Sequence, residues 1–470
     1  MRKTKLICTL GPACSDEKTI TEMINAGMNV ARMNFSHSTY EEHLSRINIV
    51  RKVSDRLKAP VAIMLDTKGP EYRIGTFKNG KVSLKDGDEF TFSARNVEGN
   101  ENIVSVNYKE LSKELSKGDT ILLDNGLLIF EVLNIKDGDI LCKVISGGNL
   151  VSRKSMSFPG KVLKQKYLSE QDKEDILFGI KNDVDYIACS FVSCRQDLVD
   201  VKNFLSENGA EGIELIAKIE NQSGVDNIEE ICKECDGIMV ARGDMGVEIS
   251  FEQLPAIQKM LITKCRMLGK RVITATEMLE SMIYNPRPTR AETSDVANAV
   301  YDGTSAIMLS GETAAGKYPV QAVKTMARIA EQTEQNIHYE KRFNSYEFVI
   351  KNTVDAISHA TCGMSIDLKA KAIVVCTLSG TTARMVSRFR SPVDIVAVTT
   401  NKKTFRKLAL SWGVTPVICD MYESMDVLFY TAKKVATETL GLKSGDKMVI
   451  TGGMTNGVSG NTNILKIETV

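Results

Sequence analysis

The sequence predicts an α/β protein in which eight parallel strands and eight helices form a (β/α)8 TIM barrel. An all-β module is expected inside the barrel sequence, and a further α/β unit is expected after it. Strand-like and helix-like segments alternate over most of the chain, but between residues 72 and 158 only short strands and turns occur. The 470 residues also suggest about three domains. An open, doubly wound sheet is the alternative to a closed barrel.

Before the module, short β-branched runs alternate with amphipathic stretches that are long enough for helices. Parallel strands need such crossover connections, so these segments predict the first βαβ units. We expect strands at 4–10, 29–34 and 61–66, and helices at 16–27 and 40–57.

The alternation resumes at Ser169 and supplies five more strands, which brings the total to the eight of a TIM barrel. We expect these strands at 184–190, 213–219, 236–241, 271–276 and 304–310. The helices are expected at 169–182, 195–209, 223–235, 254–269, 293–303 and 319–335.

The intervening and terminal segments have different patterns. Turn dipeptides such as Gly118-Asp119 separate the short strands of the module. After a polar stretch near Tyr339, a last α/β unit has expected strands at 371–377, 393–400, 414–419 and 446–452. The predicted division is barrel 1–70 and 159–340, module 71–158, and C-terminal unit 341–470.

Composition excludes several classes of function. Sixty Lys+Arg against 59 Asp+Glu leave a net charge of +1, so we expect no nucleic-acid or membrane partner. The first apolar run stops at Leu10, too early for a signal peptide, and no segment has the ~20 apolar residues of a membrane span. Eleven scattered cysteines are typical of a reducing compartment, which predicts a cytoplasmic protein. Cys232 and Cys235 have no second pair, which favours free thiols over a zinc site.

Polar side chains follow six of the eight expected barrel strands. Side chains two residues apart share a face, and the carboxyl ends of barrel strands meet at one mouth, where such enzymes carry their chemistry. We therefore predict one site there, although any single pair could be an exposed loop charge. The groups are Arg32, Asn34 and Ser36; Asp66 and Lys68; Lys218 and Glu220; Arg242 and Asp244; Thr274 and Thr276; and Ser310 and Glu312.

Two carboxylates near several cations indicate a particular chemistry. Glu220 and Asp244, beside Lys218, Arg242 and Arg32, suggest a divalent ion that bridges an anionic substrate. Positioned cations stabilise charge on a phosphoryl group in transfer. The alternative is two structural ion pairs that line the barrel. No GxxxxGK[ST] motif occurs, which excludes a P-loop, and four histidines give no Ser-His-Asp arrangement.

At these residues the sequence resembles the pyruvate kinase family, and the resemblance runs nearly end to end. The chain is similar to bacterial members without an extra C-terminal phosphotransfer-like domain. The resemblance implies that the module is a small β-barrel lid and that the last unit is a regulatory, effector-binding domain. The matching segments are TKLICTLGPA (4–13), GMNVARMNFSH (27–37), MLDTKGPEYRIG (64–75), IAKIENQSGV (216–225), GIMVARGDMGVEI (237–249), the block 273–319 and SGTTAR (379–384).

The resemblance implies transfer of the phosphoryl group of phosphoenolpyruvate to ADP, which gives pyruvate and ATP. It assigns Mg²⁺, or Mn²⁺, to Glu220 and Asp244. A K⁺ ion is assigned to Asn34, Ser36, Asp66 and the Thr67 carbonyl. The implied catalytic residues are Lys218, Arg32, Thr276, Ser310 and Glu312, and Gly243 and Asp244 join Arg32, Lys218 and Thr276 as substrate-binding residues.

The resemblance also places ADP or ATP at Asn34, His37 and Arg73. Glu71 fits the K⁺ assignment, because members of the family that dispense with K⁺ carry Lys at that position. Ser310 and Glu312 are the implied proton relay to the enolate. A homotetramer is implied as well.

The resemblance implies that two loops of the C-terminal unit bind a phosphorylated allosteric effector. Hydroxyls and helix N-terminal amides can bind an anion, although plain N-capping is the alternative. The effector could be fructose bisphosphate, a sugar monophosphate or AMP. The candidate residues are Ser379, Gly380, Thr381 and Thr382, with Gly457, Ser459 and Gly460 in the facing Gly-rich loop.

Three parts of the sequence depart from the family pattern. Gln171 replaces a Lys near the nucleotide, Lys164-Gln165-Lys166 replaces a different family segment, and Asn125 replaces an Asp of the lid. They motivate a second hypothesis, a catalytically weakened protein that binds the effector. A third is a barrel enzyme that acts on phosphoenolpyruvate without ADP.

Overall fold

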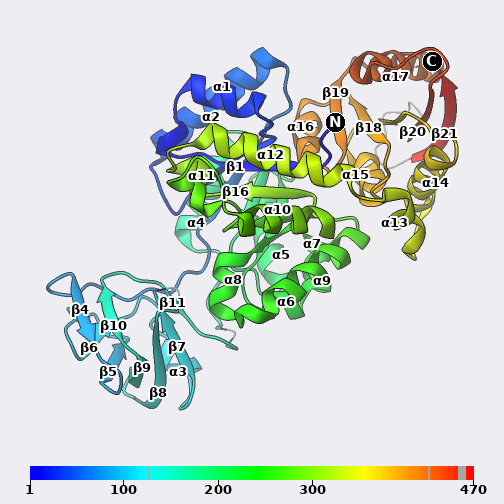
Figure 1. Cartoon of the computed structure of the whole chain (residues 1–470). Coiled ribbons are helices and arrows are strands. Elements are labelled where there is room, and N and C mark those ends of the chain that lie inside the picture. The colour runs from blue at the N-terminus through cyan, green and yellow to red at the C-terminus, as the bar shows by residue number, and fades with distance from the viewer. Residues whose placement is uncertain (125, 162, 422–423, 454–461) are drawn as a thin grey trace.

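A computed structural model describes residues 1–124, 126–161, 163–421, 424–453 and 462–470. In this part of the chain, eight parallel strands close into a barrel (Figure 1), which confirms the predicted fold class and excludes an open sheet. The strands neighbour each other in chain order. They are β1 (Lys5–Thr9), β2 (Val30–Asn34), β3 (Ala62–Asp66), β12 (Tyr186–Cys189), β13 (Glu214–Ile219), β14 (Gly237–Ala241), β15 (Arg271–Ala275) and β16 (Ala306–Leu309).

The register of the strands brings their polar ends to the same rim. Thr9 pairs with Arg32 across β1 and β2, and Asn34 pairs with Asp66 across β2 and β3. Residues at the ends of sequence-distant strands therefore become neighbours at the barrel mouth.

Helices surround the barrel, and several begin with the reciprocal hydrogen bonds of a capping box. Thr39 and Glu42 start α2, and Thr289 and Glu292 start α10 in this way. The barrel helices are α1 (Glu17–Asn25), α2 (Tyr40–Leu57), α4 (Glu170–Lys181), α5 (Arg195–Glu207), α6 (Gln222–Asp226), α7 (Ile228–Glu234), α8 (Arg242–Glu248), α9 (Leu254–Met267), α10 (Arg290–Asp302), α11 (Gly311–Ala314) and α12 (Pro319–Gln335). Short 3-10 turns are η1 (Pro12–Cys14), η2 (Phe251–Gln253) and η3 (Glu280–Ile283).

One predicted helix is divided. The segment expected as a helix over 223–235 forms α6 and α7, with Asn227 between them. The Asn227 amide donates to the Ser193 carbonyl at 3.0 Å, outside either helix. The break itself is in the backbone of Asn227, whose φ of −91° and ψ of 13° are not those of an α-helix.

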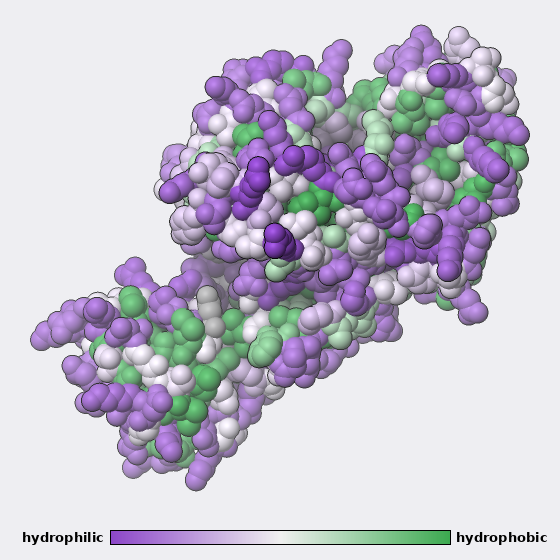
Figure 2. All heavy atoms as spheres, viewed as in Figure 1, coloured by the Kyte–Doolittle hydropathy of each residue, from purple (hydrophilic) through white to green (hydrophobic). Residues whose placement is uncertain are grey.

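The inserted module has its own core and lies on the side of the barrel opposite the C-terminal unit (Figure 1). Phe90, Phe92 and Phe130 pack against one another at its centre. Figure 2 shows apolar residues gathered over its visible face. A six-stranded and a two-stranded sheet contain β4 (Lys81–Leu84), β5 (Glu89–Ser93), β6 (Ile103–Ser105), β7 (Thr120–Leu123), β8 (Leu128–Lys136), β9 (Asp139–Ser146), β10 (Gly148–Val151) and β11 (Met156–Ser157), with the short helix α3 (Leu111–Glu114).

The C-terminal unit is a mixed sheet of order β19-β18-β17-β20-β21. Its last strand was not among the sequence predictions; it pairs antiparallel with β20 at the sheet edge. The strands are β17 (Ala372–Cys376), β18 (Asp394–Thr399), β19 (Val414–Ile418), β20 (Lys447–Gly453) and β21 (Thr462–Thr469). The other elements are α13 (Tyr339–Ser345), α14 (Thr353–Asp367), α15 (Thr381–Arg388), α16 (Lys402–Lys407), η4 (Leu408–Leu410) and α17 (Met425–Leu440). Among the described residues, no helix is both long and apolar enough to cross a membrane.

The C-terminal unit closes the barrel at the end away from the mouth. Leu410 of η4 packs into the cluster of side chains inside the barrel, together with Ile7 and Met308. Beside it, the buried Lys5 donates through Nζ to the Val414 carbonyl at 2.7 Å. Burial, followed by the charge of Arg2, lowers the pKa of Lys5 to about 7.

This lysine predicts a pH-dependent stability. Between pH 7 and its unfolded pKa of about 10.4, the unfolded chain binds a proton that the folded chain lacks. Stability should therefore rise with pH over this window, by up to about 1.4 kcal/mol per unit from Lys5 alone. Lys5→Met should remove this rise. The unfolding temperature of the wild type minus that of Lys5→Met should therefore increase between pH 7 and pH 9. The exposed Lys52→Met serves as control, and a difference that stays constant with pH would contradict the assignment.

Candidate functional site

The mouth of the barrel is organised around the carboxylate of Asp66, at the end of β3. Arg32 Nε lies 2.6 Å from its Oδ2, and Lys218 Nζ lies 3.2 Å from its Oδ1. Only 1% of the Asp66 side chain is exposed. Burial alone would raise the pKa of Asp66, but Arg32 and Lys218 hold it below the usual range. The carboxylate is therefore a permanent counter-ion for two cations.

Lys218, on β13, has two further partners. Its Nζ lies 3.0 Å from Glu220 Oε1 and donates to Ser190 Oγ at 2.7 Å. Burial would lower the pKa of Lys218, but Asp66 and Glu220 raise it overall. Lys218 therefore remains a buried cation at the mouth.

Glu220 is fully buried and incompletely neutralised. Its Oε2 accepts the Phe191 N–H at 2.6 Å. Burial raises the pKa of Glu220 to about 7, Lys218 opposes this rise, and the like charge of Asp244 adds to it. A divalent cation between Glu220 and Asp244 would stabilise the buried carboxylate and offset its repulsion by Asp244. The two side chains therefore fit such an ion. No described group of three or more His, Cys, Asp or Glu side chains could hold a metal alone, so the remaining ligands would be substrate or water.

The loops after β14 and β15 meet at a hydrogen bond. The Gly243 N–H donates to Thr276 Oγ1 at 2.8 Å. Thr276 has a φ of 70°, an uncommon value for a β-branched residue, and strain of this kind often marks functional sites. Asp244 is exposed to the mouth. Arg242, predicted to lie beside the carboxylates, instead pairs with Asp295 at 2.7 Å and does not face the substrate position.

Ser310 and Glu312 follow β16 and differ in their partners. The buried Glu312 accepts backbone N–H groups of Ser310 at 2.7 Å and Leu279 at 3.0 Å, and burial raises its pKa. It therefore fixes the loops after two strands. The buried hydroxyl of Ser310 has no hydrogen-bond partner among the described residues.

Oxygen atoms gather near the ends of β2 and β3. Asn34 Oδ1 accepts the Ser36 N–H at 3.2 Å, and the Thr67 carbonyl accepts from Ser190 Oγ at 2.7 Å. Together with Asp66 they form an oxygen-rich set that fits a monovalent cation. The side chains of Ser36 and His37 are exposed.

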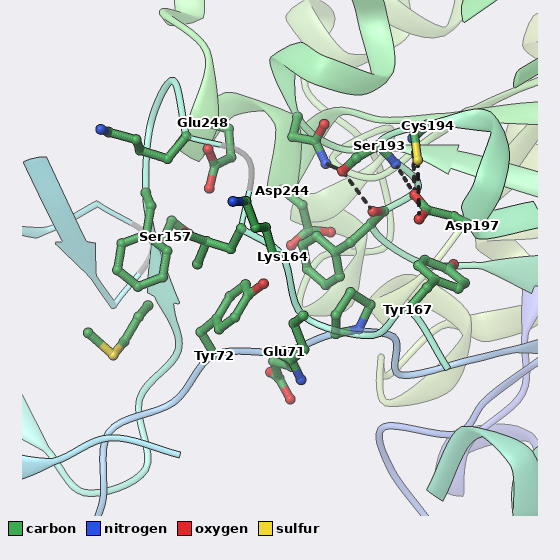
Figure 3. Close-up of a pocket in the computed structure, with 18 of the residues that line it drawn as sticks. Glu71, Tyr72, Ser157, Lys164, Tyr167, Ser193, Cys194, Asp197, Asp244 and Glu248 are labelled. Atoms are coloured by element: carbon green, nitrogen blue, oxygen red, sulfur yellow. Dashed lines mark hydrogen bonds between the residues drawn. The ribbon is translucent and has the colours of Figure 1, made fainter. Parts of the chain in front are cut away.

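A cavity of about 440 Å³ separates the barrel from the module (Figure 3). Asp244 and Glu248 of the barrel line it together with Tyr72 and Ser157 from the module side. Lys164, in the segment that leads back to the barrel, also lines it. The mouth and this cavity share Asp244.

Arg73 lies at the junction of barrel and module. It forms an ion pair with Glu71 and donates through Nη1 to the Arg153 carbonyl at 2.7 Å. Lys68 Nζ lies 3.5 Å from the other Glu71 oxygen. Arg73 is therefore tied to the start of the module rather than to the ring of charges at Asp66.

Two residues of the mouth were missed by sequence reasoning. Thr9 Oγ1, at the end of β1, accepts from Arg32 Nη1 at 2.9 Å. Ser190, after β12, donates to the Thr67 carbonyl and also contacts Asp66 at 3.3 Å. β1 and β12 are the two barrel strands for which the sequence analysis named no polar residue at the carboxyl end. The only feature that could have revealed these residues is a hydroxyl side chain at the end of each strand.

The departures from the family pattern have different settings. Gln171 Nε2 donates to Tyr40 Oη and Asp175 Oδ1, each at 3.0 Å. Asp124 pairs with Lys154 at 2.5 Å, while Asn125 lies outside the described residues.

The first predicted effector loop is held by its own hydroxyls. Gly380 N–H donates to Thr377 Oγ1 at 2.9 Å, and Ser379 Oγ lies 3.1 Å from Thr381 Oγ1. Thr382 Oγ1 lies 2.5 Å from Thr462 Oγ1, where β21 begins. Gly457, Ser459 and Gly460 lie outside the described residues.

Comparisons with known proteins agree along the whole chain. A family model described as "Pyruvate kinase, barrel domain" matches residues 1–323, and "Pyruvate kinase, alpha/beta domain" matches 355–468. Pyruvate kinase of Clostridium acetobutylicum is 47% identical, with both chains fully covered. The Staphylococcus aureus MRSA252 relative is 48% identical over the full chain and 81% of its own length. A crystal structure of a pyruvate kinase from Cryptosporidium parvum has a TM-score of 0.94 and 38% identity, covering 100% of this chain and 96% of that one.

The shared carboxylate predicts a large effect on stability. Asp66→Asn leaves Arg32 and Lys218 buried without their common counter-ion, which should destabilise the fold by about 3 kcal/mol or more. Asp295→Asn is the matched control, because its pair with Arg242 is partly exposed and should contribute about 1 kcal/mol or less. Thermal unfolding of the two variants would measure the difference. Equal shifts would show that Asp66 does not carry this role.

Proposed function

The chain belongs to the pyruvate kinase family, and we propose that its barrel mouth transfers the phosphoryl group of phosphoenolpyruvate to ADP, giving pyruvate and ATP. The observation that supports this assignment best is the buried network in which Asp66 and Glu220 hold Lys218. It presents a fixed cation beside two carboxylates, as transfer by positioning and electrostatics requires.

Glu220 and Asp244 would hold Mg²⁺, or Mn²⁺, together with substrate oxygens. The ion would supply Lewis-acid stabilisation of charge on the phosphoryl group. The raised pKa of Glu220 supports this role, because burial and the like charge of Asp244 disfavour its carboxylate form more than Lys218 favours it, and a divalent cation would offset this.

Lys218 and Arg32 would donate hydrogen bonds to the phosphoryl oxygens. Asp66 and Ser190 limit the positions of Lys218 Nζ, so little reorganisation is needed during transfer. Thr9 and Asp66 limit Arg32 in the same way. Ser190 and Thr9 are thus positioning residues, whereas the two cations would contact the substrate.

The substrate carboxylate would bind where Gly243 meets Thr276. The Gly243 N–H donates to Thr276 Oγ1 at 2.8 Å, and the Thr276 hydroxyl donates to the Ala275 carbonyl at 2.6 Å. The substrate carboxylate would replace these acceptors and receive both donors. A Cβ at Gly243 would lie 3.4 Å from Thr276 Oγ1, so a side chain there would crowd this position.

Protonation of the enolate would use Ser310, whose hydroxyl lacks a partner among the described residues. Glu312 would act behind it, since it accepts the Ser310 N–H and has a raised pKa. This relay would convert enolpyruvate to the ketone.

A K⁺ ion would be held by Asn34, Ser36, Asp66 and the Thr67 carbonyl. These oxygens lie next to Arg32 and Lys218, where a monovalent cation would add positive charge near the phosphoryl group. Glu71 is consistent with a K⁺ site. Unlike a lysine, it does not place a side-chain cation at this position, and its carboxylate is neutralised by Arg73 and Lys68.

ADP would bind at Asn34, His37 and Arg73, under the module 71–158 acting as a lid. The cavity between barrel and module, lined by Glu71, Lys164 and Asp244, adjoins the mouth and is consistent with a module that closes over it. We further propose a cytoplasmic homotetramer, with Ser379, Gly380, Thr381 and Thr382 and the loop of Gly457, Ser459 and Gly460 as the site of a phosphorylated effector.

The first test of this function is a coupled assay of pyruvate formation from phosphoenolpyruvate and ADP with Mg²⁺. Turnover should require K⁺ and fall when Na⁺ replaces it. Lys218→Met should lower kcat by roughly a hundredfold or more, because it removes a cation aimed at the transition state. Lys233→Met, which alters an exposed pair with Glu230, is the control. Turnover in Lys218→Met near the control level would refute the assignment.

Gln171 provides a separate prediction about the nucleotide. A lysine there would add positive charge beside Asp175, where the family resemblance puts a cation near the nucleotide, so Gln171→Lys should lower KM for ADP by up to about fivefold. KM for phosphoenolpyruvate should stay constant. Lys173→Gln, which alters an exposed pair with Glu170 on the same helix, is the control. An unchanged KM for ADP would mean that Gln171 does not weaken nucleotide binding.

A further inference from the structure

A second cavity, of about 380 Å³, lies between the barrel and the C-terminal unit, away from the mouth. Its walls come from α7 and α9 of the barrel, from the linker before α14, and from α14 and α15. The lining residues are Glu229, Lys264, Met267, Leu268, Val349, Lys351, Asn352, Asp355, Met385 and Arg388.

Arg388 gives this cavity a buried donor that lacks an acceptor. Its side chain is 7% exposed, and neither Nε nor Nη2 has a hydrogen-bond partner among the described residues. Asp355 Oδ1 lies 3.2 Å from Nη2, which neutralises the charge without a hydrogen bond, and Nη1 contacts Met385 Sδ at 4.0 Å. A buried donor of this kind is costly unless an acceptor reaches it. Because Arg388 lines the cavity, a carboxylate bound there would supply this acceptor.

The charges of the lining select the class of ligand. Lys264 pairs with Glu229 at 2.7 Å, and Arg388 pairs with Asp355, so both acidic residues are neutralised. Lys351 remains as a third cation, and the lining has a formal charge of +1. One negative charge is therefore the best complement, and a phosphate dianion or bisphosphate would be poorly neutralised.

The remaining wall is apolar. Met267 and Leu268 at the end of α9 lie with Met385 of α15, and Val349 is 66% exposed beside them. Methionine side chains adapt to ligands of different shape. A ligand would thus place its anionic group at Arg388 and an apolar part against these four residues.

We propose that this cavity binds a small amphipathic monocarboxylate, distinct from the phosphorylated effector of the C-terminal loops. The carboxylate accepts from Arg388 Nε and faces Lys351, and the alkyl part covers Val349 and the two methionines. The site adjoins the catalytic barrel directly, because α9 continues through Gly269 into β15, which ends beside Thr276.

Methyl NMR of the full chain, labelled at methionine Cε, tests the proposal. Substitution to Leu assigns the signals of Met267 and Met385. Acetate, butyrate and hexanoate are titrated at constant ionic strength, with succinate and inorganic phosphate as dianion comparators. Both signals should shift saturably, and affinity should increase about fourfold for each added methylene that is buried. Absent shifts, or tighter binding of succinate or phosphate, would overturn the proposal.

Two variants locate the binding. Arg388→Gln should lower hexanoate affinity at least tenfold, because the carboxylate loses its donor. Since this change also breaks the pair with Asp355, the exposed Val349→Ser provides an independent variant that should weaken hexanoate more than acetate. Val427→Ser, at another exposed valine, is the matched control. Hexanoate affinity in Val349→Ser equal to that of the control would overturn the site, even if Arg388→Gln fails to fold.

Discussion

The mouth of the barrel depends on one buried carboxylate shared by two cations. Asp66 lies within hydrogen-bond distance of both Arg32 and Lys218, with almost no access to water. Without it, Arg32 would lose its counter-ion, Lys218 would keep only Glu220, and the two buried positive charges would repel each other. Because Glu220 and Ser190 are arranged around the same Lys218 ammonium, the geometry of the whole mouth follows from this interaction.

Much of the fold could be predicted, because the strands of a closed parallel barrel are continuous apolar runs that end in polar groups. The charged residues of the mouth followed from the same pattern. Ser190 and Thr9 did not, since a hydroxyl after a strand has the same appearance as a capping residue. The partner of Arg242 was also unpredictable, because Asp295 belongs to a helix more than fifty positions away. Strand β21 was missed because its half-exposed, edge position gives it a weak apolar pattern.

Gln171, one of the departures from the family sequence, lies outside the Asp66 network. The side-chain amide of Gln171 donates hydrogen bonds to Tyr40 and Asp175. It therefore forms a stable local contact and leaves no unpaired group at the mouth. The position of Gln171 thus separates the proposed nucleotide site from the groups proposed to act on the phosphoryl group. The hypothesis of a weakened, effector-binding protein therefore concerns ADP affinity more than the integrity of the catalytic residues.

The position of Leu410 has a consequence for how this molecule can be divided. The barrel is complete in its strands, yet its interior is closed by a side chain from η4, and Tyr186 on β12 donates to the Lys407 carbonyl at 2.5 Å. The end of the barrel opposite the mouth is thus closed by a residue of the C-terminal unit. A rearrangement of the C-terminal unit would therefore change the packing at the lower end of the strands that carry the mouth. No separate linker would be needed to transmit it. Exchange of this unit between relatives would succeed only if the barrel residues that contact it, such as Ile7, Met308 and Tyr186, matched the incoming η4.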